Sequence, residues 1–333
     1  PELSPSCGMR VLIAFGLAVG AALKVGPGLV LAPQRDGTRR KLRNAGAPVP
    51  VGEIPPPDGG WFDGQQMGSC VVKRFVDEMV GERWMMWYSA RSDGFGADQN
   101  LVSTPTGRVG LAQSTDGIVW ERLAGDESAG SCLAPNDESW WAFDTTHVGV
   151  GDVHVRSSDM VQNSMGLYWM YYFGGNAEEQ PQPGGAPPTT GGTMSIGLCL
   201  SNDGVHWGRV EGEHPSGALL EPLDGQTFVG WPQVEQMSES PEEWVLWYHA
   251  RDEKDGQVAI GAAASANCIE WEHRGYCLTP GAAGAFDEAS VSARCVVRDP
   301  ASPARGSGKG WLMYYEGSDA EGRAAIGLAR SGD

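Results

Sequence analysis

One sequence pattern recurs along this chain in a fixed order. Its clearest copy begins with Val109-Gly110-Leu111-Ala112 and ends at Trp120, ten residues after the glycine. The run returns at Ile196–Trp207 and, with less similarity, at Ile260–Trp271, and it starts again at Ile326. Repeats of this kind indicate one supersecondary unit used several times, so they constrain the fold more than any other feature.

Three further motifs accompany this run, always in the same order. A weaker Leu-x-Pro motif precedes each opening Phe, the opening Phe is usually followed by Asp, and an aromatic segment comes after the opening. The openings are Phe62-Asp63, Phe143-Asp144, Phe228-Val229 and Phe286-Asp287. The aromatic segments are Trp84–Tyr88, Tyr168–Tyr172, Trp244–Tyr248 and Trp311–Tyr315, and the Leu-x-Pro motif begins at Leu31, Leu133, Leu220 and Leu278.

The residues of each repeat favour short β-strands. Segments rich in Trp, Tyr, Val and Met suit buried pleated strands, and Ser-x-Asp-Gly predicts a turn, because Ser and Asp bond nearby backbone groups and Gly accepts a positive φ. Four short antiparallel strands per repeat describe a propeller blade. The sequence therefore predicts an all-β fold, a five-bladed β-propeller of four-stranded antiparallel blades. Four blades are the alternative, since four openings occur.

Composition narrows the function classes. The chain has 333 residues, 48 of them Gly and 22 Pro, which fits many turns, and its formal net charge is -18. Such a charge argues against nucleic acid as a partner, because phosphate contacts need a basic surface. Seven cysteines show no metal-ligand spacing, so we expect neither a metal site nor a cofactor.

The N-terminal region predicts a separate segment, residues 1–25, before a single propeller domain over residues 26–333. The apolar stretch Val11–Leu23 allows three interpretations: a targeting signal, a membrane anchor, or a strand that closes the ring. The first two imply an organelle, such as a plastid or thylakoid lumen, or the secretory route. Within the propeller, residues 35–60 and 176–192 are predicted to be loop insertions.

These motifs resemble the five-bladed β-propellers of the arabinanase, invertase and levansucrase superfamily of glycoside hydrolases. The resemblance extends from about Gly26 to the end of the chain. It implies a central funnel in which an Asp of the first blade, an Asp of the second and a Glu of the third carry out the chemistry. The matching opening positions are Asp63, Asp144 and Val229, so the third position lacks a carboxylate.

This departure matters because glycoside cleavage needs an acid to protonate the leaving oxygen and a second carboxylate as base or nucleophile. Glu235, Asp287 and Glu316 are candidate substitutes, and the predicted catalytic set is Asp63, Asp144 and Glu316. The predicted substrate-binding residues are Arg91, Arg251, His249, Trp231 and Asp287. The arginines suit a carboxylate or phosphate, and the tryptophan suits a sugar ring. A structural role for the repeated aspartates and arginines is the alternative.

Two functions follow from different classes. The first is a glycoside hydrolase-like propeller that acts on or binds a glycan, or another small molecule, in the funnel. The second is a catalytically inactive propeller that serves as a scaffold or accessory subunit of a larger assembly, associated with an organellar membrane through the N-terminal segment. The aspartates favour the first function, and Val229 favours the second.

Overall fold

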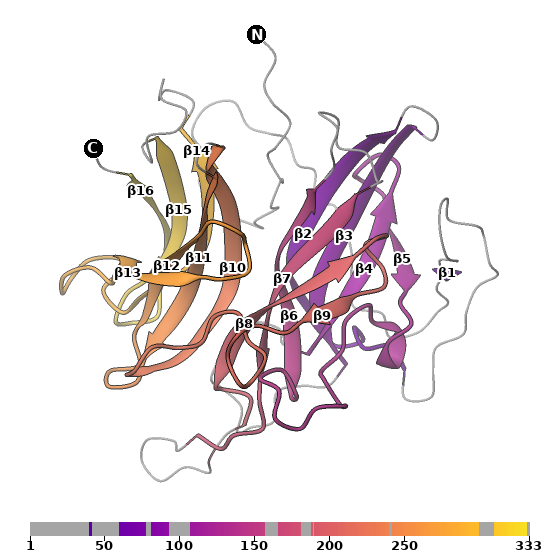
Figure 1. The fold of residues 1–333 in the computed structure, drawn as a ribbon. Coiled ribbons are helices and arrows are strands. Elements are labelled where there is room, and N and C mark those ends of the chain that lie inside the picture. The colour runs from indigo at the N-terminus through magenta and orange to yellow at the C-terminus, as the bar shows by residue number, and fades with distance from the viewer. Residues whose placement is uncertain are drawn as a thin grey trace.

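The computed structural model describes residues 40–41, 60–77, 81–92, 107–156, 166–180, 188, 190–239, 242–299 and 310–331. Within these ranges the chain forms β-strands and one 3-10 turn, η1 (Ser128–Gly130), so the predicted all-β fold is confirmed. The strands form four consecutive antiparallel units, here called units 1 to 4, which follow one another from indigo to yellow in Figure 1.

Each unit is an antiparallel meander. Unit 1 contains β2 (Gln66–Asp77), β3 (Gly81–Arg91), β4 (Arg108–Ser114) and β5 (Glu121–Ala124). Unit 2 contains β6 (His147–Arg156), β7 (Leu167–Gly175), β8 (Met194–Ser201) and β9 (Gly208–Val210). Unit 3 contains β10 (Gln226–Glu239), β11 (Glu242–Asp252), β12 (Val258–Ser265) and β13 (Glu272–Leu278), and unit 4 contains β14 (Ser290–Arg298), β15 (Trp311–Ser318) and β16 (Ala324–Arg330). A short strand, β1 (Arg40–Lys41), pairs parallel with β5.

Neighbouring units are joined through their inner parts. A parallel pair links Phe228 of β10 to Met194 of β8, and another links Val258 of β12 to Ser290 of β14. The first strand of each unit pairs with the aromatic second strand, and the Gly-Leu-Ala run forms the third. The described residues thus hold four units, and a fifth blade would need residues outside them.

The predicted turn is present after the third strand. The Oγ of Ser114 accepts hydrogen bonds from the backbone N–H groups of Asp116 and Gly117, and Asp116 Oδ1 accepts two more from residues 118 and 119. The same bonds recur at Ser201 and Asp203. In unit 3, Cys268 occupies the glycine position with a φ of 66°, which a side chain adopts only at a cost.

The glycine of the Gly-Leu-Ala run is required by close packing. A Cβ on Gly110 would lie 2.4 Å from the Phe62 ring and 2.5 Å from the Tyr88 ring. The matching glycines of the other units, Gly197, Gly261 and Gly327, would place a Cβ equally close to Tyr172, Tyr248 and Tyr315. In units 1 and 2, the rings of the opening Phe and the second aromatic therefore pack directly on this glycine, which leaves no room for a side chain.

The core lies between successive units. The Nε1 of Trp87 in unit 1 donates to the carbonyl of Gly204 in the unit 2 turn at 2.8 Å. One unit further on, the Tyr171 hydroxyl donates to the carbonyl of Cys268 at 3.0 Å. The repeat tryptophan Trp207 meets Trp87 edge to face, with ring centroids 6.2 Å apart. In units 1 and 2 the first aromatic of the pair therefore fixes its unit to the turn of the next unit.

Unit 4 also has an apolar face of the kind that packs against the following unit in units 1 to 3, but the described residues contain no unit after it. Its residues Tyr314, Ile326 and Leu328 are 41%, 60% and 56% exposed. In the units before it, the matching residues are buried against the following unit, as Trp87 and Leu111 are in unit 1. The apolar surface of unit 4 is therefore the open end of the described series.

Of the predicted insertions, residues 176–192 are partly described. Gln180 donates to Thr193 Oγ1 at 2.8 Å, and the N–H of Gly191 donates to Asn176 O at 2.9 Å, so both ends of this insertion are bonded. The segment 1–25 and, apart from Arg40–Lys41 and Gly60, the insertion 35–60 lie outside the described residues. No helix within the described ranges has the length and apolar character needed to cross a membrane.

Candidate functional site

The two repeat aspartates are fully buried and bonded within their own units. Asp63 Oδ2 accepts hydrogen bonds from the Tyr88 hydroxyl at 2.9 Å and from Arg122 Nε at 2.7 Å. Asp144 Oδ2 accepts the same two bonds, from Tyr172 at 2.9 Å and Arg209 at 2.7 Å. Each aspartate therefore connects the start of the first strand of its unit, here called the inner strand, to the second and fourth strands of the same unit.

The arginines of these bonds were missed from the predicted site, although the sequence contains their signal. Arg122 and Arg209 both stand two residues after the repeat tryptophan. The predicted site instead contains Arg91 and Arg251. Arg91 is buried near His147 of unit 2, and Arg251 Nε donates to Gly256 O at 3.1 Å in its own unit.

Unit 3 departs from this motif, and its predicted alignment with the other units was wrong. Phe228 pairs with Arg251 in the way that Gln66 pairs with Arg91. Both arginines lie three residues after the second aromatic of their units. The position that corresponds to Asp63 is therefore Gly225, three residues before Phe228, and Val229 is an ordinary buried residue of β10.

The loss of the aspartate in unit 3 is matched by a change of its partner. His273 stands where units 1 and 2 carry the arginine, and its Nδ1 lies 2.9 Å from the Tyr248 hydroxyl. The other ring nitrogen lies 3.1 Å from the carbonyl of Glu221. Burial lowers the pKa of His273, so a neutral ring replaces the charged pair.

In unit 4, Asp287 again accepts a hydrogen bond from the second aromatic, Tyr315, at 2.8 Å. Burial and this bond raise the pKa of Tyr315 to about 12. Glu316, the next residue, is exposed on β15 and pairs with Ser292 and Ile326. The structure therefore distributes Asp63, Asp144 and Asp287 over separate units, each with its own partners.

Each inner strand contains an irregularity near its start. The pairing register shifts around Ser69, Gly151, Trp231 and Ala293 in the four units. Ser69, Trp231 and Ala293 have positive φ angles of 41°, 49° and 43°. Bulges of this kind are frequent at barrel rims and next to functional sites, where they change the direction in which a side chain points.

Trp231 is the largest side chain at these bulges, and it lies in an aromatic cluster. Its ring centroid is 4.5 Å from that of Phe173 and 5.4 Å from that of His249, with Phe228 at 5.9 Å. The predicted pair Trp231 and His249 is thus brought together, while Phe173 was missed. The Trp231 ring is only partly buried.

The backbone of this bulge is held from the next unit. Arg294 is buried, and its Nη2 donates to the carbonyl of Trp231 and, at 2.7 Å, to the carbonyl of Trp247. On the other side, a Cβ on Gly151 would lie 2.3 Å from Pro232. The left-handed conformation of Trp231 is therefore fixed by both neighbouring units.

Further along the inner strands, polar side chains link the units. Asp152 accepts hydrogen bonds from the N–H groups of Val153 and Val234, and Gln233 exchanges two hydrogen bonds with the backbone of Val296. Two positions after Asp152 and Gln233 stand His154 and Glu235. Burial raises the pKa of the Glu235 carboxyl, and the charge of Asp152 adds to this effect while His154 and Lys73 oppose it.

The described residues contain no cluster of three or more metal-ligating side chains. No family model and no curated protein sequence matches the chain. Among solved structures, it is similar to a complex of BT0996 with RGII, with a TM-score of 0.53 and 18% identity over 85% of this protein and 74% of that one. A structure described as "Glycoside hydrolase" gives a TM-score of 0.53 and 18% identity over 84% and 73%. The protein therefore has a β-propeller fold of the kind found in glycoside hydrolases.

Proposed function

We propose that this protein binds a glycan at the mouth of the propeller, over Trp231, and does not hydrolyse it. The observation that carries this proposal is the conformation of Trp231, a partly exposed tryptophan held at a positive φ on an inner strand. Strained residues that the surrounding structure fixes tend to lie at functional sites. A flat indole held in this way suits stacking on the apolar face of a sugar ring.

The surroundings of Trp231 support a ligand site. The Trp231 indole lies against the Phe173 ring, with ring centroids 4.5 Å apart, and it stays partly exposed. The His249 ring lies beside the indole and carries nitrogen atoms that can bond hydroxyl groups. An aromatic surface and a polar ring thus occur together at one bulge.

The buried aspartates support binding without hydrolysis. A carboxylate that acts on a glycosidic bond must contact the sugar, whereas Asp63 and Asp144 are fully buried and bonded by a tyrosine and an arginine. The recurrence of this bonded aspartate in units 1, 2 and 4 fits a structural role. The sequence-based assignment of Asp63, Asp144 and Glu316 as catalytic residues remains an alternative prediction.

One observation favours a hydrolytic alternative with a different acid. The pKa of Glu235 is raised by burial, and a raised pKa suits a general acid. On this alternative, Glu235→Gln abolishes turnover of a glycoside, whereas on the binding proposal no turnover exists to be lost.

The test uses purified protein and a panel of arabinan, fructan, xylan and mannan oligosaccharides. We expect saturable binding without release of sugar, and Trp231→Ala should weaken it by about tenfold, the effect of one aromatic stacking contact. The matched control is Trp140→Ala, since Trp140 is 89% exposed. Trp231→Phe, which keeps a stacking ring, should retain most of the affinity.

Two results would refute the proposal. One is hydrolysis of any oligosaccharide that disappears in Asp63→Asn or in Glu235→Gln while the fold is intact. The other is the absence of binding to every glycan of the panel, which would favour the predicted role as a scaffold or accessory subunit of an organellar assembly. Far-UV circular dichroism of each variant separates loss of function from loss of fold.

A further inference from the structure

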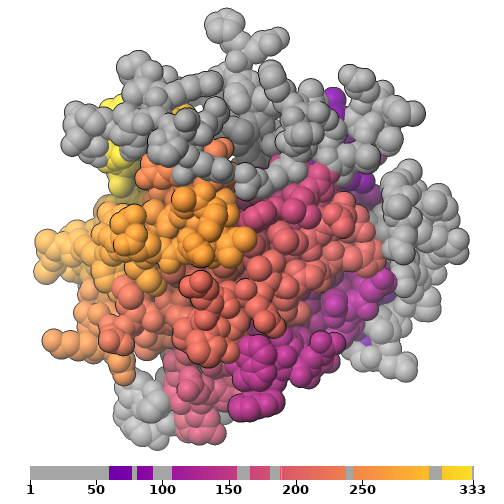
Figure 2. Space-filling view, viewed as in Figure 1, coloured from indigo at the N-terminus to yellow at the C-terminus, as the bar shows by residue number. Residues whose placement is uncertain are grey.

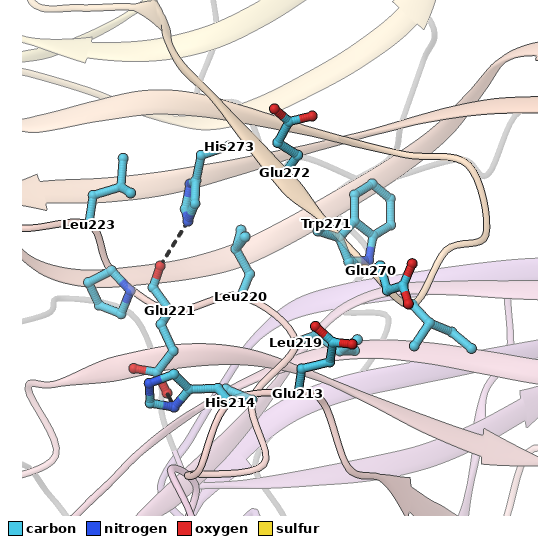
Figure 3. A pocket seen from close by; sticks show the side chains of 13 residues that line it. Glu213, His214, Leu219, Leu220, Glu221, Leu223, Glu270, Trp271, Glu272 and His273 are labelled. Carbon is cyan, nitrogen blue, oxygen red and sulfur yellow. Dashed lines mark hydrogen bonds and ion pairs between the residues drawn. The ribbon is translucent and has the colours of Figure 1, made fainter.

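A pocket of about 500 Å³ opens at the boundary between units 2 and 3 (Figure 3). One wall is the segment after β9, with Glu213, His214 and residues 218–223, and the other is the stretch Ile269–His273 at the start of β13. On the face drawn in Figure 2, the surfaces of units 2 and 3 adjoin. The pocket belongs to this outer boundary and is separate from the bulge at Trp231.

The repeat shows what occupies the matching place between units 1 and 2. Asp126 corresponds to Glu213, because each follows a glycine that stands five residues after the repeat tryptophan. His206 corresponds to Glu270, because each immediately precedes that tryptophan. His206 Nε2 lies 2.9 Å from Asp126 Oδ2, and His206 Nδ1 lies 2.7 Å from Asp203 Oδ2. A cationic ring thus closes the boundary between units 1 and 2.

At the boundary between units 2 and 3, an anionic side chain stands at the position that His206 holds between units 1 and 2. Glu270 stands in place of His206, and Glu213 lines the same pocket. Asp203 is replaced by neutral Asn267, whose amide donates to Glu270 Oε2 at 3.1 Å. Glu213 and Glu270 line one pocket from its two walls, and like charges in one pocket repel each other, so the site favours a positive group supplied from outside.

The rest of the pocket defines the shape of that group. Two more carboxylates line it, Glu221 and Glu272, which pair with His214 at 2.9 Å and Arg274 at 3.1 Å. Apart from His273, the remaining lining is apolar and consists of Ala218, Leu219, Leu220, Pro222, Leu223, Ile269 and Trp271. An apolar surface beneath acidic groups suits a side chain with an aliphatic stem and a charged head, and the indole suits a cation–π contact.

We propose that this pocket binds a lysine or arginine side chain from a basic segment of a partner protein. The cationic head takes the place that the His206 ring holds between units 1 and 2, and Glu213 and Glu270 contact it. The aliphatic stem lies on Leu219 and Trp271. This inference is independent of glycan binding.

The test measures fluorescence anisotropy of a labelled peptide, Thr-Arg-Arg-Lys-Leu-Arg, the sequence of residues 38–43. We expect saturable binding that weakens with added salt, as for exposed charges. Glu213→Gln with Glu270→Gln should weaken it by at least about tenfold, since two charge-assisted contacts are lost. The control is Glu138→Gln with Glu179→Gln, which removes the same charge from two exposed sites elsewhere.

A second variant tests the geometry rather than the charge. Glu270→His rebuilds the contact seen between His206 and Asp126, so at about pH 6, where His is largely charged, it should close the pocket and abolish peptide binding. Equal losses in the pocket and control variants would overturn the proposal, because binding would then follow net charge alone. Wild-type affinity in folded Glu270→His at the same pH would also overturn it.

Discussion

At the scale of single residues, the repeated aspartate has the sequence signature of a catalytic group and the surroundings of a structural one. Asp63 is fully buried, and its carboxylate receives a hydroxyl and a guanidinium from its own sheet. Burying a charge is costly unless it is paired and hydrogen-bonded. The aspartate and the arginine therefore depend on each other, and unit 3 has lost both together.

The first prediction concerns this pair. Asp63→Asn should lower the free energy of unfolding by about 2–3 kcal/mol, because Asn keeps the shape but leaves Arg122 without its anionic partner. Denaturant titration measures the change, with exposed Asp137→Asn as the control. A variant as stable as the wild type would contradict the structural role.

At the scale of elements, the turn after the third strand joins one unit to the previous one. In unit 2 this turn accepts the Trp87 indole bond at Gly204, and it also carries His206, which reaches Asp126. The sequence predicted the turn from Ser-x-Asp-Gly, because its hydrogen bonds are local. The contacts that the turn makes with other units could not be predicted, since they depend on how the sheets pack.

The second prediction concerns the positive charge of His206 in its contact with Asp126 and Asp203. The hydrogen bond to Asp203 is the main reason why the pKa of His206 is raised in the folded protein, with Asp126 adding to it. A raised pKa means that the contribution of His206 to stability is full below about pH 6.5, its ordinary value. It is lost as the pH rises through the folded value.

Thermal unfolding of wild type and His206→Gln measures this effect. The melting temperatures should differ most below about pH 6.5, the ordinary pKa of His, and should converge as the pH rises above the raised pKa of His206 in the folded protein. A difference that grows with pH would have the wrong sign for a protonated histidine between two carboxylates. Because His206 is partly exposed, added salt should reduce the difference at low pH.

At the scale of the whole molecule, the order of the motifs was sufficient to predict an all-β propeller. The described strands follow that order through four units. The alignment failed at unit 3, because Phe228-Val229 matched the opening motif by residue type, whereas the strand pairing places Gly225 at the position of Asp63. Asp152 was missed for another reason: it bonds the backbone of the next unit, and nothing in its own segment signals such a contact.

The candidate site was predicted only in part. Trp231 and His249 were identified and lie together, but the sequence could not indicate the positive φ of Trp231 or the role of Phe173, which comes from another unit. Arg294, which holds the bulge, was also missed. These contacts join residues far apart in the chain, so only the packing of the units reveals them.

The most direct test of the central claim is a crystal structure of this protein with a bound oligosaccharide from the binding panel. We predict a sugar ring stacked on the Trp231 indole, with a hydroxyl group bonded to His249 and with the glycosidic bonds intact. Asp63 and Asp144 should remain bonded to Arg122 and Arg209. A sugar bound elsewhere, or a glycosidic bond held between carboxylates released from those arginines, would contradict the claim.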